Sequence, residues 1–185
     1  MRLLAASALL AVGAFAAGCS STDTYAPVPQ EPPAAGPERS AAAFERLRGL
    51  AGTWQGEFTH GDEKGPTAVR YRVTSGGSAV EEVLFGGTPH EMVTMYHLDG
   101  PRLLLTHYCA AGNQPTMVLA PGDDPSVLRF GFLRATNLKG PGDGHMHEAV
   151  IELPAPDRLK SSWTFWAEGK PGDTAVIETR RAEAK

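Results

Sequence analysis

Short segments in which apolar and polar residues alternate, separated by turn-forming residues, fill this chain from residue 67 to residue 181. Residues 67–74 show the pattern best, since Val69, Tyr71 and Val73 fall on one face and two arginines on the other. Glycine- and proline-rich turns lie between the segments, and no helical pattern interrupts the series. Further strands are predicted at 79–85, 91–98, 101–109, 116–120, 127–134, 145–153, 159–167 and 174–181. About ten strands at this spacing predict an all-β sandwich or barrel.

A tryptophan at the opening of the first strand decides between these two architectures. The sequence from Gly52 to Gly56 (Gly-Thr-Trp-Gln-Gly) follows a short amphipathic helix, for which Ser40 is the predicted N-cap. A helix that leads through Gly-x-Trp into a strand resembles the opening of calycin barrels, the superfamily of lipocalins, fatty-acid-binding proteins and nitrobindin-like domains. The resemblance implies an up-and-down antiparallel β-barrel of about ten strands with a short N-terminal helix, over residues 41–185. Trp54 would plug one end, and the other end would be open for a small ligand.

The same resemblance implies a partner for the plug. In many calycins an arginine from the last strand packs over the tryptophan. The last predicted strand ends in Arg180 and Arg181. We expect Arg180 to take this place, with Arg181 as the alternative, because strand parity alone cannot choose between two neighbours.

The N-terminal residues read as a targeting segment and a tether. Residues 1–18 combine Arg2 with an apolar run too short to span a bilayer, as in a signal peptide. Ala16-Ala17-Gly18-Cys19 resembles a bacterial lipobox, which implies acylation of Cys19 and a lipid-anchored lipoprotein; an ordinary secretory signal is the alternative. Ser20 then favours the outer membrane, facing the periplasm. The proline-rich residues 19–40 are predicted to form a disordered tether.

The charge of the chain and its two cysteines limit which partners and which disulfide are expected. The formal net charge is −4, and no basic stripe is interleaved with aromatic residues, so nucleic acid is not an expected partner. The chain has two cysteines. If Cys19 is acylated, Cys109 has no disulfide partner within one chain. It is then a buried small apolar residue, a reactive thiol or a metal ligand.

One predicted hairpin places polar residues on an apolar face. With a two-residue turn at Asp99-Gly100, Tyr96 shares a face with His107 and Cys109. That mixture of apolar bulk and a few polar tips is typical of ligand pockets. Asn113 and Gln114 are expected at the strand end or rim, where their amides can bind a ligand. The alternative is a core histidine bonded to a backbone carbonyl, followed by an ordinary turn.

Two further strands carry candidate site residues. Alternation places His145 and His147 on the apolar, inward face, where they could bind a polar ligand or, with His107 or Cys109, a zinc ion. A purely structural role is the third alternative. Trp163 is also expected inside the barrel, as a core or ligand-facing residue.

Adjacent glutamates in the strand at 79–85 are unusual. One of Glu81 and Glu82 must point inward unless a β-bulge intervenes. An inward carboxylate would need a partner such as an arginine or a histidine. We interpret the pair as a bulge at the barrel edge with both charges in water.

Together these features predict an envelope lipoprotein whose barrel binds a small, partly apolar molecule. Two alternatives stay open for the interior: a histidine-based enzyme, with or without a metal, and a haem-binding protein of the nitrobindin kind. A third is a structural or assembly factor that acts through the barrel surface. The sequence names neither the ligand nor any cofactor.

Overall fold

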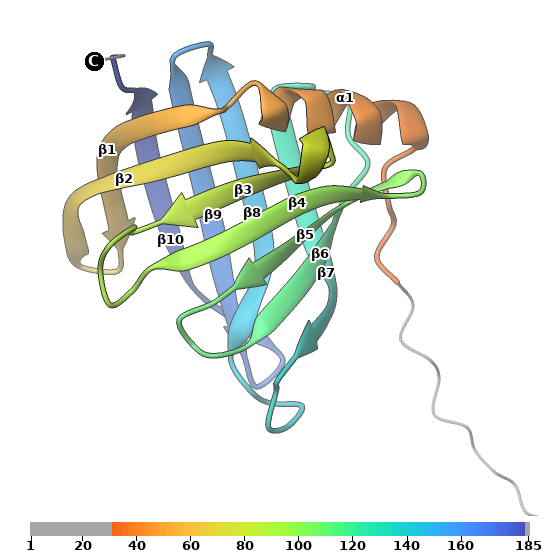
Figure 1. Ribbon diagram of the computed structural model, residues 1–185. Helices are drawn as coiled ribbons and strands as arrows, with labels where there is room; N and C mark the ends of the chain where they lie inside the picture. Colours follow the sequence, from red (N-terminus) through yellow and green to blue (C-terminus); the bar gives the residue numbers. More distant parts are fainter. Residues whose placement is uncertain (1–30, 184–185) are drawn as a thin grey trace, which may run out of the picture. The chain divides into compact units, whose positions relative to one another are not determined.

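The computed structural model describes residues 31–183, which form one helix and ten strands around a common core. Figure 1 shows the helix, α1 (Pro37–Arg48), lying across one end of the sheet. The strands are β1 (Gly52–His60), β2 (Glu63–Thr74), β3 (Ala79–Leu84), β4 (Met92–Asp99), β5 (Arg102–Tyr108), β6 (Gln114–Leu119), β7 (Val127–Thr136), β8 (His145–Ala155), β9 (Arg158–Ala167) and β10 (Lys170–Arg181).

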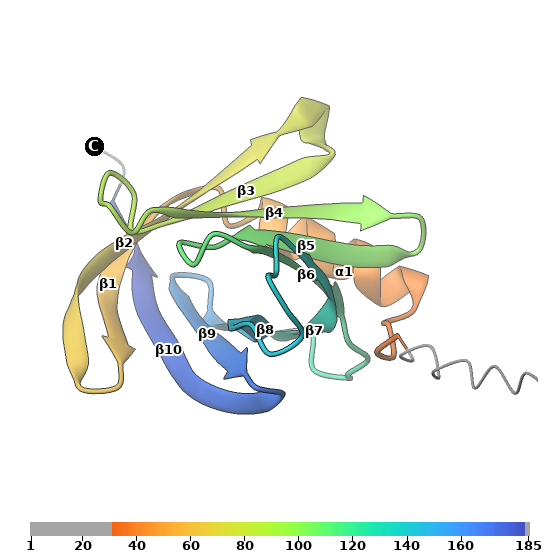
Figure 2. The same cartoon turned by 90° about the horizontal axis from the view of Figure 1, so that it is seen from below.

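The sheet closes on itself. Each strand pairs antiparallel with the next in sequence, and β1 pairs with β10 from Trp54↔Arg181 to Thr59↔Val176. The predicted all-β, up-and-down barrel with a short N-terminal helix is therefore confirmed, and the sandwich is excluded. Figure 2 views the barrel from the end away from α1. Among residues 31–183, the structure has no helix that is long and apolar enough to cross a lipid bilayer.

The helix begins earlier than the sequence pattern predicts. Gly36 is the N-cap and Pro37 occupies the first turn, where the missing N–H of proline costs nothing. The prediction of Ser40 as N-cap is wrong, since Ser40 lies inside the helix and is buried. Residues 37–40, expected in the tether, belong to the folded domain. The predicted signal segment, Cys19 and the tether up to residue 30 lie outside the described residues.

Helix and barrel meet at the tryptophan plug. Trp54 is fully buried, and its Nε1 donates a hydrogen bond to the carbonyl of Leu50 at 2.9 Å. The guanidinium of Arg181 lies 4.4 Å from the centroid of a Trp54 ring. It also donates to the carbonyls of Gly49 and Ala51, both at 2.9 Å. One side chain thus stacks on the plug and binds the carbonyls that follow the helix.

Arg180 does not pack on the plug, so that prediction is wrong. The register sets Arg181 directly opposite Trp54, and successive residues of a strand point to opposite faces. Arg180 is exposed and lies opposite Arg158 of β9 instead.

The β4–β5 turn also differs from its prediction, but the same residues of β4 and β5 still face the barrel interior. Asp99 pairs with Arg102, so the two turn residues are Gly100 and Pro101 rather than Asp99 and Gly100. This moves the pairing by two residues. Because side chains alternate with a period of two, the inward set stays inward.

The plug contacts allow a test with neighbouring arginines. Arg181→Ala should lower the free energy of unfolding by about 1–2 kcal/mol, because it removes a cation–π contact and two hydrogen bonds. Arg180→Ala, one residue away on the outer face, should change it by less than about 0.5 kcal/mol. Urea denaturation of both variants measures the difference. Equal effects would contradict this account of the plug.

Candidate functional site

Four inward-facing polar residues lie side by side across four neighbouring strands. The register sets Tyr71 of β2 opposite Glu82 of β3, Glu82 opposite Thr94 of β4, and Thr94 opposite His107 of β5. All four are buried. Buried polar groups are costly unless they bond to one another, so a continuous row of them is the least ordinary feature of this interior. We call these four residues the polar row.

Glu82 is the centre of the row. One carboxyl oxygen accepts a hydrogen bond from the Tyr71 hydroxyl at 2.5 Å, and the other accepts one from the Tyr96 hydroxyl at 2.7 Å. Burial raises the pKa of Glu82, while its hydrogen bonds to Tyr71, Tyr96 and Thr94 act to lower it. Burial and the nearby carboxyl raise the pKa of both tyrosines, so their hydroxyls remain protonated donors.

The edge-bulge interpretation of the two glutamates is wrong. β3 pairs regularly with both neighbours, so alternation sends Glu82 inward and Glu81 outward. Glu81 forms ion pairs with Arg72 at 2.8 Å and Arg70 at 3.4 Å on the outer face. The inward carboxyl is partnered by phenols rather than by the arginine or histidine considered from the sequence.

His107 ends the row. Its Nδ1 lies 2.9 Å from Thr94 Oγ1, whereas its Nε2 is buried and has no hydrogen-bond partner among residues 31–183. Burial lowers the pKa of His107 to about 4, so the ring is neutral at neutral pH. A neutral imidazole nitrogen that is buried without a protein partner can form one further hydrogen bond, to a water molecule or to a ligand atom.

Trp163 faces His107 from the other side of the barrel. The two ring centroids are 4.6 Å apart, although β5 and β9 are four strands apart around the barrel. Trp163 is also buried, and its Nε1 likewise has no partner within the described part of the chain. The pair therefore crosses the lumen and carries two unsatisfied polar atoms, of which one is a donor.

His145 and His147 lie at the other end of β8 from the plug, in an aromatic cluster. His147 stacks between Phe132 at 4.5 Å and Trp166 at 4.1 Å, and its Nδ1 is 3.0 Å from His145 Nε2. Burial, followed by the charge of His145, lowers the pKa of His147 to about 4. The cluster is half-buried and already fills the space around His147.

His145 and His147 lie side by side at the start of β8, where both rings contact Phe132 and both are half-buried. The β8–β9 register shifts between Met146 and Glu148, so His147 is the extra residue of a bulge. As a result Met146 lies opposite Phe165, on the face of Trp163, and His145 lies opposite Trp166.

The remaining predicted residues lie around the β5–β6 loop. Asn113 is buried, and its amide nitrogen donates to the carbonyl of Gly144 at 2.8 Å, tying this loop to the β7–β8 loop. Gln114 bonds within the sheet, accepting from Thr136 at 2.8 Å. Cys109 is a half-buried free thiol whose pKa is raised by burial. These contacts are structural ones, although Asn113 Oδ1 has no partner among residues 31–183.

The histidines do not assemble into a metal centre. Within residues 31–183 the structure contains no group of three or more His, Cys, Asp or Glu side chains that could hold a metal ion. The ring of Trp163 lies 4.6 Å from that of His107, on the side where a haem bound to this histidine would lie.

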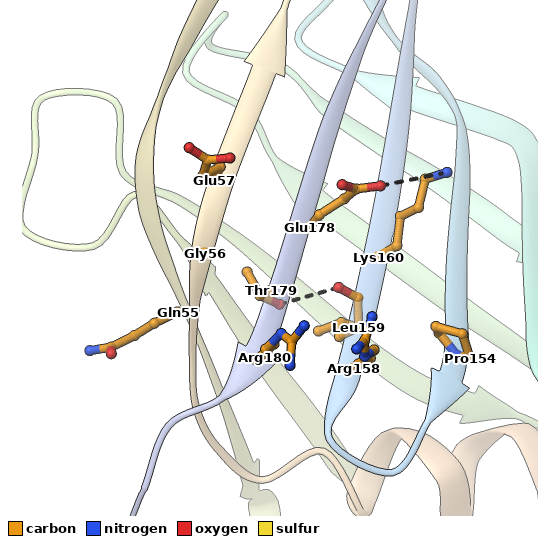
Figure 3. Close-up of a pocket in the computed structure, with 10 residues that line it drawn as sticks. All are labelled: Gln55, Gly56, Glu57, Pro154, Arg158, Leu159, Lys160, Glu178, Thr179 and Arg180. Carbon is orange, nitrogen blue, oxygen red and sulfur yellow. Dashed lines mark hydrogen bonds and ion pairs between the residues drawn. The ribbon is translucent and has the colours of Figure 1, made fainter.

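The outer wall carries a shallow groove of about 380 Å³ across β1, β9 and β10, drawn in Figure 3. Arg158 and Arg180 lie opposite each other in it, and Lys160 reaches Glu178 at 4.0 Å and Glu152 at 3.5 Å. The groove thus carries charged side chains of both signs on an open surface, in contrast to the buried polar atoms of the interior.

Comparison with known proteins shows the fold alone. Neither a protein-family model nor a curated protein sequence matches the chain. Several solved structures are similar, and two of them are as follows. One, from Nostoc punctiforme, is a protein with unknown function from the DUF3598 family. Its sequence is 13% identical, the match covers 74% of this chain and 49% of that chain, and the TM-score is 0.51. The other is Rv2717c from M. tuberculosis. Its sequence is 15% identical, the match covers 76% of this chain and 98% of that chain, and the TM-score is 0.53. The chain thus spans about half the length of the first protein.

Sequence reasoning selected two groups of this site and missed others. It chose Tyr96 and His107, which the barrel brings to the polar row, and Trp163, which faces His107. It left out Tyr71 and Glu82. The adjacent glutamates and the regular alternation of residues 67–74 were the available signals. Only the β2–β3 register shows that a tyrosine hydroxyl meets the carboxyl.

The lowered pKa of His107 generates a prediction on stability. The unfolded chain, with a histidine pKa of about 6.5, takes up this proton before the folded protein does. The contribution of His107 to stability should therefore fall as the pH decreases from about 6.5 to about 4, by about 3 kcal/mol in full. Urea denaturation of the protein and of His107→Gln at several pH values measures it.

Comparing the two proteins isolates His107. The raised pKa of Glu82 acts in the opposite sense, because it adds stability at low pH that is lost as the pH rises through the folded-state pKa. The pH-dependent contributions of Glu82 and His147 to stability are present in both the unaltered protein and His107→Gln, so they cancel in the comparison of the two proteins. If the difference in unfolding free energy between them does not vary with pH, His107 is not a buried neutral group.

Proposed function

We propose that this protein is a calycin-like binding protein that holds a small, partly apolar molecule inside its barrel. The observation that carries the proposal is the buried Nε2 of His107, which has no partner in the described residues and lies beside a tryptophan ring. Ligand pockets combine apolar and aromatic walls with a few polar groups that orient the ligand. His107 Nε2 and Trp163 Nε1 would be those groups.

The ligand would enter at the end away from Trp54, where several apolar side chains are half-buried. Phe58 lies roughly 13 Å along β1 from the plug and makes an edge-to-face contact with Phe85 at 5.4 Å. Met92 and Met146 pack against the core and are also half-buried. Methionine side chains adapt readily to a new neighbour. Their movement, together with that of Trp163, would open the room that a ligand needs.

Binding suits this interior better than catalysis. General acid–base catalysis needs a group whose pKa lies near the working pH. The pKa of His107 is lowered to about 4 by burial, and that of His147 to about 4 by burial and the charge of His145. Both rings are therefore suited to accept or donate a fixed hydrogen bond rather than to exchange a proton during a reaction.

We further propose that the barrel is carried on a lipid-anchored envelope protein. The support is the sequence alone: the apolar run that ends in Ala16-Ala17-Gly18-Cys19, and the proline-rich residues that follow. Acylated Cys19 would hold the domain at the outer membrane, facing the periplasm, where it could retain an apolar compound.

Ligand binding can be tested with the apolar fluorophore N-phenyl-1-naphthylamine. His107→Leu should weaken its binding about fivefold, because one hydrogen bond contributes about 1 kcal/mol. His97→Leu makes the same chemical change on the outward side of β4 and should leave the affinity unchanged. Fluorescence titration measures both, and native mass spectrometry of protein from its own host identifies any retained compound. Equal affinities in the two variants would place binding elsewhere.

The anchor can be tested separately. Cys19→Ser should move the protein from the membrane fraction to the soluble fraction and abolish incorporation of labelled palmitate, because the acceptor sulfur is lost. Cys109→Ser, the matched control on the other cysteine, should change neither. An unlabelled parent protein would instead support an ordinary secretory signal.

A further inference from the structure

The polar row behaves as a chain of hydrogen bonds whose direction can be derived. Thr94 lies directly opposite Glu82, whose pKa its hydroxyl acts to lower, and Thr94 Oγ1 lies 2.9 Å from His107 Nδ1. A threonine hydroxyl has one proton, so it can donate to only one of its two neighbours and accepts from the other. The neighbour that receives the proton decides which nitrogen of His107 carries a hydrogen.

The carboxyl receives that proton. Burial raises the pKa of Glu82, but both tyrosine hydroxyls donate to it, at 2.5 and 2.7 Å, and short bonds of this kind favour the ionised form. An ionised carboxylate only accepts hydrogen bonds. Thr94 must then donate to Glu82 as a third hydroxyl, and three such bonds compensate for the removal of the charge from water. The Thr94 oxygen is left to accept from His107.

It follows that His107 carries its hydrogen on Nδ1. Nδ1–H donates to Thr94 Oγ1 across the 2.9 Å contact, and the second nitrogen of a neutral imidazole has a free lone pair. That second nitrogen is Nε2, the buried atom without a partner in the described chain. A protonated Glu82 that donated to Thr94 would reverse the chain and put the hydrogen on Nε2.

We propose that Glu82, acting through Thr94, holds His107 as the Nδ1–H tautomer, so that the site selects ligands that present a hydrogen-bond donor to Nε2. Glu82 and Thr94 are thus positioning residues, and His107 is the residue that contacts the ligand. The choice of ligand class rests on the proposed function; the tautomer does not. The expected ligands are aromatic or otherwise apolar molecules with a hydroxyl or N–H group, since Trp163 supplies a flat apolar surface beside Nε2.

The tautomer can be measured without any ligand. Two-bond ¹H–¹⁵N correlation spectra of the purified protein, with His107 labelled, distinguish a ring protonated on Nδ1 from one protonated on Nε2. We expect the Nδ1–H pattern in the native protein. Glu82→Gln, whose amide can donate to Thr94, should move His107 toward the Nε2–H form, and Thr94→Val should leave it a mixture.

Tyr71→Phe is the matched control in the same row. It removes one donor to Glu82 but keeps Glu82, Thr94 and His107, so the His107 spectrum should still show the Nδ1–H pattern. An Nε2–H pattern in the native protein overturns the proposal. A spectrum that Glu82→Gln and Thr94→Val leave unchanged overturns it as well. If Glu82→Gln does not fold, Thr94→Val still decides, since it exchanges two side chains of similar shape.

Phenol and its methyl ether, anisole, test the ligand class. They share one ring, but only phenol has a donor. Phenol should bind the native protein about fivefold more tightly, and this ratio should fall toward one in Glu82→Gln and in His107→Leu. Equal binding of both by the native protein overturns the donor requirement. If neither binds, the proposed function fails with it, while the spectra still decide whether Glu82 controls His107.

Discussion

The structure depends on the pairing of the first strand with the last. Once β1 bonds to β10, the sheet has no edge, and the inward face of every strand shares one enclosed interior. Trp54 lies in this seam, directly opposite Arg181, so the residues that close the sheet also seal one end of it. The hydrogen bonds from Arg181 to Gly49 and Ala51 bring the end of α1 to the same place.

Closing the barrel removes its interior polar groups from water, and the contacts of the polar row show how they are satisfied. An enclosed interior excludes water, so each polar group within it must find a partner from another strand. Tyr71, Glu82, Thr94 and His107 do so in a line, with Tyr96 joining at the carboxyl. The line stops at His107 Nε2, which finds none among residues 31–183. This network ends on one buried nitrogen that has no partner in the described chain, and for this reason the proposed ligand site lies there rather than in the charged groove of the outer wall.

Much of the fold could be predicted, and part of the site. The strand positions and the inward placement of Tyr96, His107 and Trp163 follow from local patterns, whereas the tryptophan plug was implied by the resemblance to calycin barrels. The errors have a common origin in pairing between strands. The sequence cannot decide between Arg180 and Arg181, because the two are adjacent and only the pairing of β1 with β10 sets one of them opposite Trp54. The bulge at His147 likewise leaves no local mark in the sequence. Glu82 was assigned to water because a carboxyl next to another carboxyl is ordinarily exposed, and its partners come from two different strands.

The sequence alone determined which segments extend and where they turn, since period-two alternation and turn residues act within a few positions of each other. It also carried the signal-like N-terminal run and Cys19, on which the proposed anchor rests. Only the tertiary structure decided which side chains meet. Contacts such as Tyr71 with Glu82, or His107 with Trp163 across the lumen, depend on register and closure. A shift of one residue in register would turn every one of these groups to the opposite face.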